Sequence, residues 1–114
     1  MSGRFAFKKK QSLLKNGEFA KTRKKGKKIV LKNFRIFVLT NNLSRERLGV
    51  SISKRLCNAA RRNRVKRLIR EFFRHNREKF PKSSDILITV ADAKPLIQLR
   101  DIETGLSGFF KKAS

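Results

Sequence analysis

One stretch constrains the fold more than any other, the segment at residues 57–74. Its apolar residues recur at the i, i+3, i+4, i+7 and i+8 spacing that makes one face of an α-helix, and they are Val65, Leu68, Ile69, Phe72 and Phe73. The rest of that helix surface is basic, and Glu71 is the only acid in the segment. An ordinary exposed helix mixes acids with bases. The segment therefore predicts a long helix with one face in the core and one arginine-rich face toward a polyanion.

The net charge of the whole chain points the same way. Of 114 residues, 31 are lysine or arginine and 8 are aspartate or glutamate, which gives a formal charge of +23. Self-repulsion at this charge opposes compaction, and a bound polyanion relieves it. No apolar run approaches the roughly 20 residues of a membrane-spanning helix. We expect one domain at residues 1–114 that binds nucleic acid and no membrane, with residues 1–12 as a basic, mobile arm.

Groups with catalytic or redox chemistry are few. Cys57 is the only cysteine, so no intrachain disulfide and no cysteine-based zinc site can form. His75 is the only histidine, and it lies among basic residues far from any cluster of acids. We therefore expect no catalytic residue and no metal ligand on the protein. The start of the chain also lacks the apolar core of a signal peptide, which fits a cytoplasmic protein.

The other segments predict a small sheet with helices packed on it. In chain order we expect a helix at 16–25 capped by Asn16, strands at 30–39 and 48–53, the long helix capped by Asn58, a strand at 85–90 and a helix at 99–110. The polar run at 41–46 predicts a hairpin between the first two strands. Alternation in the second strand predicts an open face of Gly49, Ser51 and Ser53 that admits a ligand backbone. The fold class is α+β, a two-layer α/β sandwich of order α-β-β-α-β-α with a three- to four-stranded sheet.

The run Arg-Asn-Arg-Val-Lys-Arg-Leu-Ile-Arg-Glu at residues 62–71 closely resembles the signature of the bacterial ribonuclease P protein component. That family is the small basic subunit that assists a catalytic RNA in removing the 5′ leader from precursor tRNA. The resemblance extends over almost the whole chain, from Phe19 and Lys25-Gly26 to the closing helix. It implies a left-handed βαβ crossover, against the usual right-handed rule, in a fold also found in a ribosomal-protein domain.

The resemblance also implies two sets of site residues. The set expected to bind the catalytic RNA is Arg62, Asn63, Arg64, Lys66, Arg67 and Arg70. The set expected in a cleft for the single-stranded leader, between the sheet and the first helix, is Phe19, Arg23, Phe37, Ser51 and Lys54. Phe19 and Phe37 either stack on bases or only pack in the core. Arg23 stands where some members carry phenylalanine, which favours phosphate contact there.

The function implied is that of the protein subunit of an RNA-catalysed endoribonuclease. The RNA uses Mg²⁺ and performs the hydrolysis, and one protein per RNA supplies positive charge, broadens substrate use and lowers the magnesium requirement. A structural RNA-binding or ribosomal protein with no part in cleavage is the alternative. A protein-only nuclease is a more distant one, because the sequence lacks a carboxylate cluster.

Overall fold

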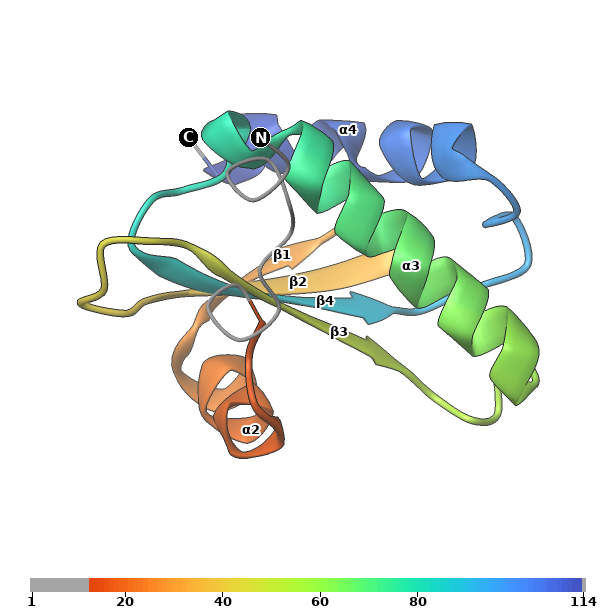
Figure 1. The fold of residues 1–114 in the computed structure, drawn as a ribbon, viewed down its shortest axis with the longest axis horizontal. Helices are drawn as coiled ribbons and strands as arrows, with labels where there is room; N and C mark the ends of the chain where they lie inside the picture. The colour runs from red at the N-terminus through yellow and green to blue at the C-terminus, as the bar shows by residue number, and fades with distance from the viewer. Residues whose placement is uncertain (1–12, 114) are drawn as a thin grey trace, which may run out of the picture.

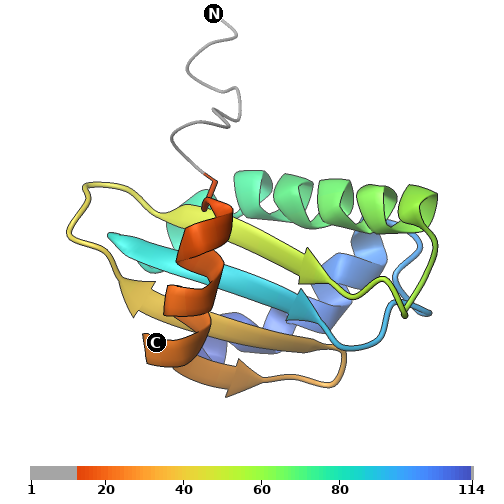
Figure 2. The ribbon, with the colours of Figure 1, turned by 90° about the horizontal axis from the view of Figure 1, so that it is seen from below.

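The computed structural model describes residues 13–113, and the basic arm predicted at 1–12 lies outside them. The elements are helix α2 (Asn16–Lys25), strands β1 (Lys27–Val30), β2 (Phe34–Thr40) and β3 (Arg47–Ile52), helix α3 (Ala59–His75), the 3-10 helix η1 (Arg77–Lys79), strand β4 (Ser84–Val90) and helix α4 (Leu99–Ala113). The strands form one sheet in the order β1-β2-β4-β3. Helices α3 and α4 cover one face and α2 crosses the other (Figures 1 and 2). The expected α+β fold is confirmed, and α2 adds a partial layer on the second face.

The predicted hairpin between β2 and β3 is wrong, because β4 lies between these two strands. Strand β4 pairs antiparallel with β2 and parallel with β3. It is the most completely buried strand, and Ile86, Leu87 and Ile88 are almost completely buried, which fits a central place with both faces covered. In Figure 2, β3 (yellow-green) and β4 (cyan) point the same way, β4 lies below β3, and α3 lies behind the sheet. This arrangement is a left-handed crossover, as the resemblance implies.

The single strand expected at 30–39 is two strands. Strand β1 pairs antiparallel with β2, and the Leu31 N–H donates to the Phe34 carbonyl oxygen at 2.9 Å to close the turn between them. The sequence did not predict β1, because the strand begins with Lys27 and Lys28 and lysine is in general depleted in strands. Both are exposed on this edge strand, where lysine also hinders edge-to-edge aggregation.

The N-terminal caps of α2 and α3 differ from each other. Asn58 caps α3 as expected, and its side chain accepts a hydrogen bond from the Arg61 N–H at 2.8 Å. Asn16 is not the cap of α2, because Asn16 is already the first residue of the helix and Lys15 is its N-cap residue. There the Lys15 N–H donates to Glu18 Oε1 at 2.8 Å. The Glu18 carboxylate thus stabilises the helix start without a short polar side chain at the cap.

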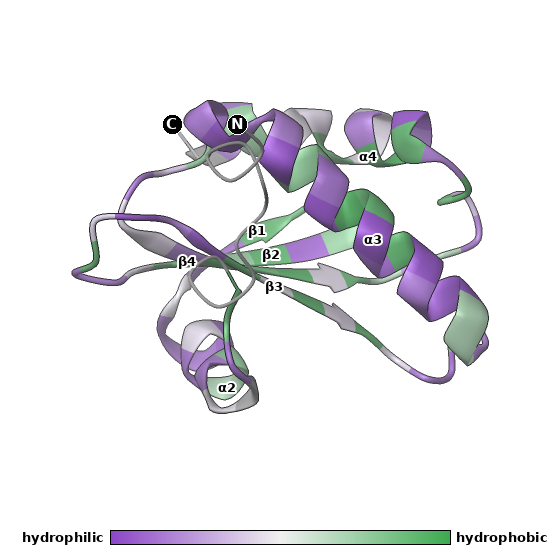
Figure 3. Cartoon of the chain, viewed as in Figure 1, coloured by the Kyte–Doolittle hydropathy of each residue, from purple (hydrophilic) through white to green (hydrophobic). Residues whose placement is uncertain are grey.

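The core is divided by the sheet. The larger cluster lies between the sheet and helices α3 and α4, and of the predicted α3 face Val65, Ile69, Phe72 and Phe73 are buried while Leu68 is partly buried. In Figure 3 the strands are largely green, and α3 alternates between green and purple along its length. The smaller cluster lies beneath α2 and contains Leu14, Phe37 and Leu87, with Phe19 packed against it.

A buried acid stabilises the end of the molecule that carries η1. Glu46 is 4 % exposed, and its carboxylate accepts hydrogen bonds from Arg77 Nε at 2.9 Å and Lys82 Nζ at 3.3 Å. Burial raises the pKa of Glu46, but the Arg77 hydrogen bond and the nearby positive charges outweigh burial and hold the pKa below its ordinary value of 4.5. The carboxylate therefore stays charged and paired near neutral pH.

Candidate nucleic-acid interface

The polar and basic residues of helix α3 lie on its exposed side and along one flank. Asn63, Arg64 and Arg67 are exposed and point away from the core. Arg62, Lys66 and Arg70 follow at i, i+4 and i+8 and are half-buried along the flank beside β3. The six residues predicted to bind the catalytic RNA therefore lie on one continuous basic surface, which we call the α3 face.

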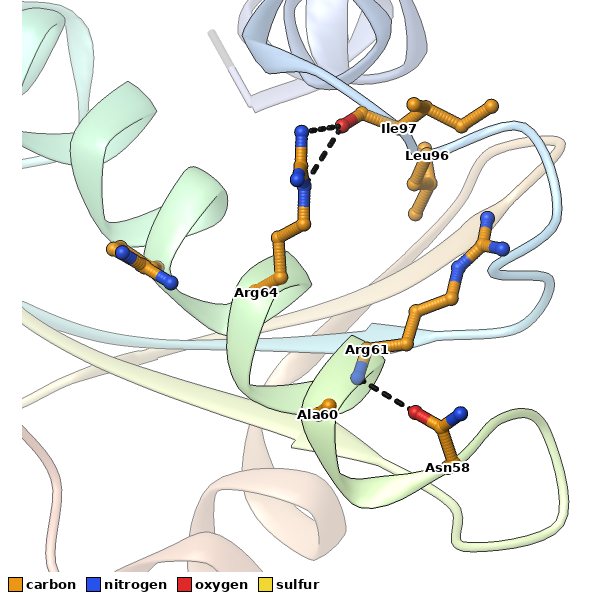
Figure 4. Close-up of a pocket in the computed structure, with 7 residues that line it drawn as sticks. Asn58, Ala60, Arg61, Arg64, Leu96 and Ile97 are labelled. Carbon is orange, nitrogen blue, oxygen red and sulfur yellow. Dashed lines mark hydrogen bonds between the residues drawn. The ribbon is translucent and has the colours of Figure 1, made fainter.

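The flank of α3 that faces α4 is fixed by arginine contacts. Arg64 donates from Nε at 3.1 Å and from Nη2 at 2.9 Å to the Ile97 carbonyl oxygen. Arg61 donates from Nη2 to the carbonyl oxygens of Ala93 and Lys94 at 2.9 and 2.8 Å. These bonds attach the loop before α4 to the first two turns of α3 (Figure 4). Arg61 was not among the predicted site residues, although its place one turn before Arg64 continues the same basic period.

The opposite flank of α3 meets the start of α2 at the β3 edge. Lys66 and Arg70 line a shallow pocket together with Phe19 and Gly49, and the rest of its wall is Leu13, Leu14, Leu48 and Val50. The buried Nε of Arg70 has no hydrogen-bond partner among the described residues. The structure thus brings Phe19, predicted for the leader, next to two cations predicted for the catalytic RNA.

An ion-pair network holds α2 on the sheet. Arg47 donates from Nε and Nη2 to the two carboxylate oxygens of Asp85, each at 2.8 Å. Nη2 also lies 2.9 Å from Glu18 Oε2 on α2. Asn41 Nδ2 donates to Asp85 Oδ1 at 2.8 Å. The bonds to Asp85 raise the pKa of Arg47 still further, so the guanidinium stays charged. Sequence reasoning missed this network, because its members are far apart in the chain.

The face expected to be open on β3 is only partly open. A Cβ atom on Gly49 would lie 2.8 Å from Phe19 Cε1 and 3.0 Å from Leu14 Cδ1, so α2 closes that end. Two residues further along β3 the sheet is less covered. Ser51 pairs there with Thr89, and Thr89 pairs with Arg35. None of the three is buried. Helix α2 runs across the strands beside this row (Figure 2). We call Ser51, Thr89 and Arg35 the polar strip.

The predicted leader residues lie at different depths. Phe19 is half-buried over Gly49, whereas Arg23 on α2 and Lys54 just after β3 are exposed. Phe37 is 8 % exposed beneath α2, so its ring offers little surface to a base and packs instead. Thr89 and Arg35 were missed, because only the strand register places them beside Ser51. The Oγ1 atom of Thr89 is buried without a hydrogen-bond partner in residues 13–113.

Other chemistry is sparse within the described part of the chain. Residues 13–113 hold no group of three or more histidine, cysteine or acidic side chains that could bind a metal ion. His75 Nε2 lies 3.9 Å from Glu71 Oε1 on the exposed surface of α3, which is an ordinary surface pair. No helix in that range is long and apolar enough to cross a membrane. The arrangement suits binding of a polyanion by charge and shape.

The fold and the α3 face define the class, a small and strongly basic α+β protein built around an arginine-rich helix. A family model described as Ribonuclease P matches residues 7–114. The ribonuclease P protein component of Desulfosudis oleivorans is 36 % identical over 110 residues, which is 96 % of this chain and 91 % of the relative. That of Syntrophus aciditrophicus is 41 % identical over 85 residues, 75 % of this chain and 71 % of the relative. The chain belongs to the ribonuclease P protein family.

Solved structures agree with that assignment. The RNase P protein of Staphylococcus aureus superposes with a TM-score of 0.79 at 30 % identity, covering 90 % of this chain and 94 % of that one. The Thermotoga maritima protein gives a TM-score of 0.79 at 25 % identity, covering 89 % and 96 %. The resemblance seen in residues 62–71 is therefore confirmed. Membership makes this chain a protein component of a ribonucleoprotein endoribonuclease of tRNA 5′ processing.

Proposed function

We propose that this protein binds the catalytic RNA of ribonuclease P through the α3 face and the precursor-tRNA leader through the polar strip beside α2. The observation that carries the proposal is the pocket shared by Phe19, Lys66 and Arg70 at the β3 edge. The two surfaces meet there, so a leader strand that leaves the active site of the RNA can pass directly onto the sheet. One protein binds each RNA, and the complex is cytoplasmic.

The leader surface suits a single strand of RNA. Ser51, which is not buried, offers a hydroxyl group to phosphate or ribose oxygens, and Phe19 offers the exposed part of its ring to a base. Arg23 follows Glu18 by five residues, and a rotation of about 140° on the helix turns it away from the Arg47 side toward the polar strip. Arg23 therefore contributes positive charge along the path of the backbone.

The chemical step belongs to the RNA, which uses Mg²⁺. The protein contributes by neutralising phosphates of both RNA partners and by holding the leader in one orientation. Cations supplied by α3 and α2 replace part of the ion atmosphere that the two RNAs otherwise need to approach each other. The protein therefore lowers the magnesium concentration at which cleavage reaches half its maximal rate.

Reconstitution tests this proposal. Protein alone, catalytic RNA alone and their mixture are assayed on precursor tRNA at low magnesium. We expect cleavage only in the mixture. Cleavage by the protein alone would indicate a protein nuclease, and a mixture no more active than the RNA alone would indicate a structural RNA-binding protein; either result contradicts the proposal.

A further inference from the structure

A second pocket lies at the opposite flank of α3, between the first turns of the helix and the loop before α4. It is lined by Asn58, Ala60, Arg61, Arg64, Arg67, Leu96 and Ile97. Arg61 and Arg64 project from successive turns of α3 toward the loop that carries Leu96 and Ile97 (Figure 4). The lining contains three arginines and no acid. This pocket is separate from the leader surface, which lies on the other face of the sheet.

Ile97 gives this pocket an exposed apolar surface. Its side chain is 58 % exposed, and only Val30, at 48 %, is another exposed large hydrophobic residue within residues 13–113. A single exposed isoleucine is ordinary on a protein surface. The position of Ile97 beside three guanidinium groups is less so, because it places an exposed apolar side chain next to concentrated positive charge.

The backbone of Ile97 is held from both sides. Its N–H donates to Asp101 Oδ2 at 3.0 Å, and its carbonyl oxygen accepts the two bonds from Arg64. The Asp101 carboxylate also accepts from the Gln98 N–H at 2.9 Å, and these N–H bonds hold the pKa of Asp101 below its ordinary value. The Asp101 carboxylate is thus directed at the backbone of the loop. Ile97 is fixed in place before any ligand arrives.

The arginines retain donors for a ligand. A guanidinium group has five N–H donors, and the contacts of Arg61 and Arg64 to the loop use Nη2 of the first and Nε and Nη2 of the second. Nη1 of both groups has no protein partner within residues 13–113, and neither has the side chain of exposed Arg67. The pocket therefore combines a fixed apolar surface with a rim of unsatisfied cationic donors.

We propose that this pocket receives one unpaired base of the catalytic RNA, with the base face on Ile97 and the flanking phosphates on Arg61, Arg64 and Arg67. The inference rests on the proposed function and adds a base-binding site to the α3 face. An unstacked nucleotide has a flat apolar face within a few ångströms of anionic phosphates, which matches the surface described. The guanidinium planes can also stack on the base.

Substitution of Ile97, with substitution of Val30 as the control, tests the inference. Ile97→Ser and Val30→Ser remove similar exposed side chains, and neither is expected to alter the fold, which circular dichroism checks. Affinity for the catalytic RNA alone, without tRNA, is measured in the full chain over a series of salt concentrations. We expect Ile97→Ser to bind about fivefold more weakly, at the low end of the loss of one base contact, with an unchanged salt slope. Val30→Ser should bind as the wild type does, and Ile97→Phe at least as tightly.

Chemical probing of the RNA gives the second readout. Wild-type protein and Val30→Ser should protect one unpaired base that becomes reactive again with Ile97→Ser. Unchanged affinity and unchanged protection with Ile97→Ser would overturn the inference while leaving the proposed function intact. So would a loss of affinity accompanied by a shallower salt slope, because that would mean displaced arginines and not a lost base contact. Absence of RNA binding by the wild type would instead overturn the proposed function.

Discussion

Replacing Arg47 with methionine tests how α2 is held against the sheet. Methionine keeps most of the apolar stem and removes the guanidinium, so Asp85, whose side chain is 8 % exposed, loses both bonds from Arg47. Removing one partner of a buried pair costs about 3–5 kcal/mol. Arg47 is 16 % exposed and Asn41 still donates to Asp85, so the low end applies. Loss of the more exposed contact to Glu18 adds about 0.5 kcal/mol.

We therefore expect Arg47→Met to lower the free energy of unfolding by about 3.5 kcal/mol, which for a chain of this length lowers the melting temperature by about 14 °C. Urea unfolding, monitored by circular dichroism, measures the loss of unfolding free energy. Arg74→Met is the matched control, because Arg74 is 43 % exposed with its carboxylate partner at 3.7 Å, and it should change stability by less than about 0.5 kcal/mol.

A second variant separates the lost pair from lost packing. In Arg47→Met combined with Asp85→Asn no buried carboxylate is left without its partner, so the pair of substitutions should cost less than the sum of the two single changes. Additive effects, or a loss for Arg47→Met no larger than that of Arg74→Met, would refute the account of how α2 is seated.

Three further predictions concern the α3 face, the leader surface and the buried acid. Arg64→Ala combined with Arg67→Ala should reduce the salt slope of catalytic-RNA binding by about 2 and leave the fold intact; an unchanged slope in a filter-binding titration would contradict it. Phe19→Ala should weaken binding of precursor tRNA about tenfold but not that of mature tRNA, and equal loss for both would mean that Phe19 only packs. Because the pKa of Glu46 is lowered in the folded state, its contribution is present above pH 4.5 and is lost as the pH falls through the folded pKa. Glu46→Gln should therefore cost about 2 kcal/mol at pH 7, and urea titrations should show the difference from wild type shrinking below pH 4.5.

Local periodicity was enough to predict the helix at the centre of this fold. Apolar residues recur regularly enough between Val65 and Phe73 to fix which face of α3 enters the core, and Asn58 marks where the helix begins. The excess of arginine over acid on the opposite face predicts a surface for a polyanion, and the structure keeps these residues together on the α3 face. These features depend on residues within a few turns of each other.

Strand pairing could not be predicted in the same way. Alternation in β3 is equally compatible with a neighbour at β2 or β4, and only the burial of β4 on both faces decides between them. For the same reason the sequence predicted only Ser51 of the polar strip, since Thr89 and Arg35 lie beside it only through the strand register. Gly49 looked open because the residue that covers it, Phe19, lies 30 positions earlier in the chain.

The central claim is that two different RNAs contact two different faces of one small protein. Single-cysteine crosslinking tests it most directly, with Cys57→Ser as the background and a photo-reactive group on Ala60→Cys for the α3 face or on Ser51→Cys for the polar strip. In the assembled complex with precursor tRNA, we expect the first position to crosslink to the catalytic RNA whether or not the tRNA carries a leader, and the second to crosslink to the leader only. Crosslinks from both positions to the same RNA segment would contradict the account.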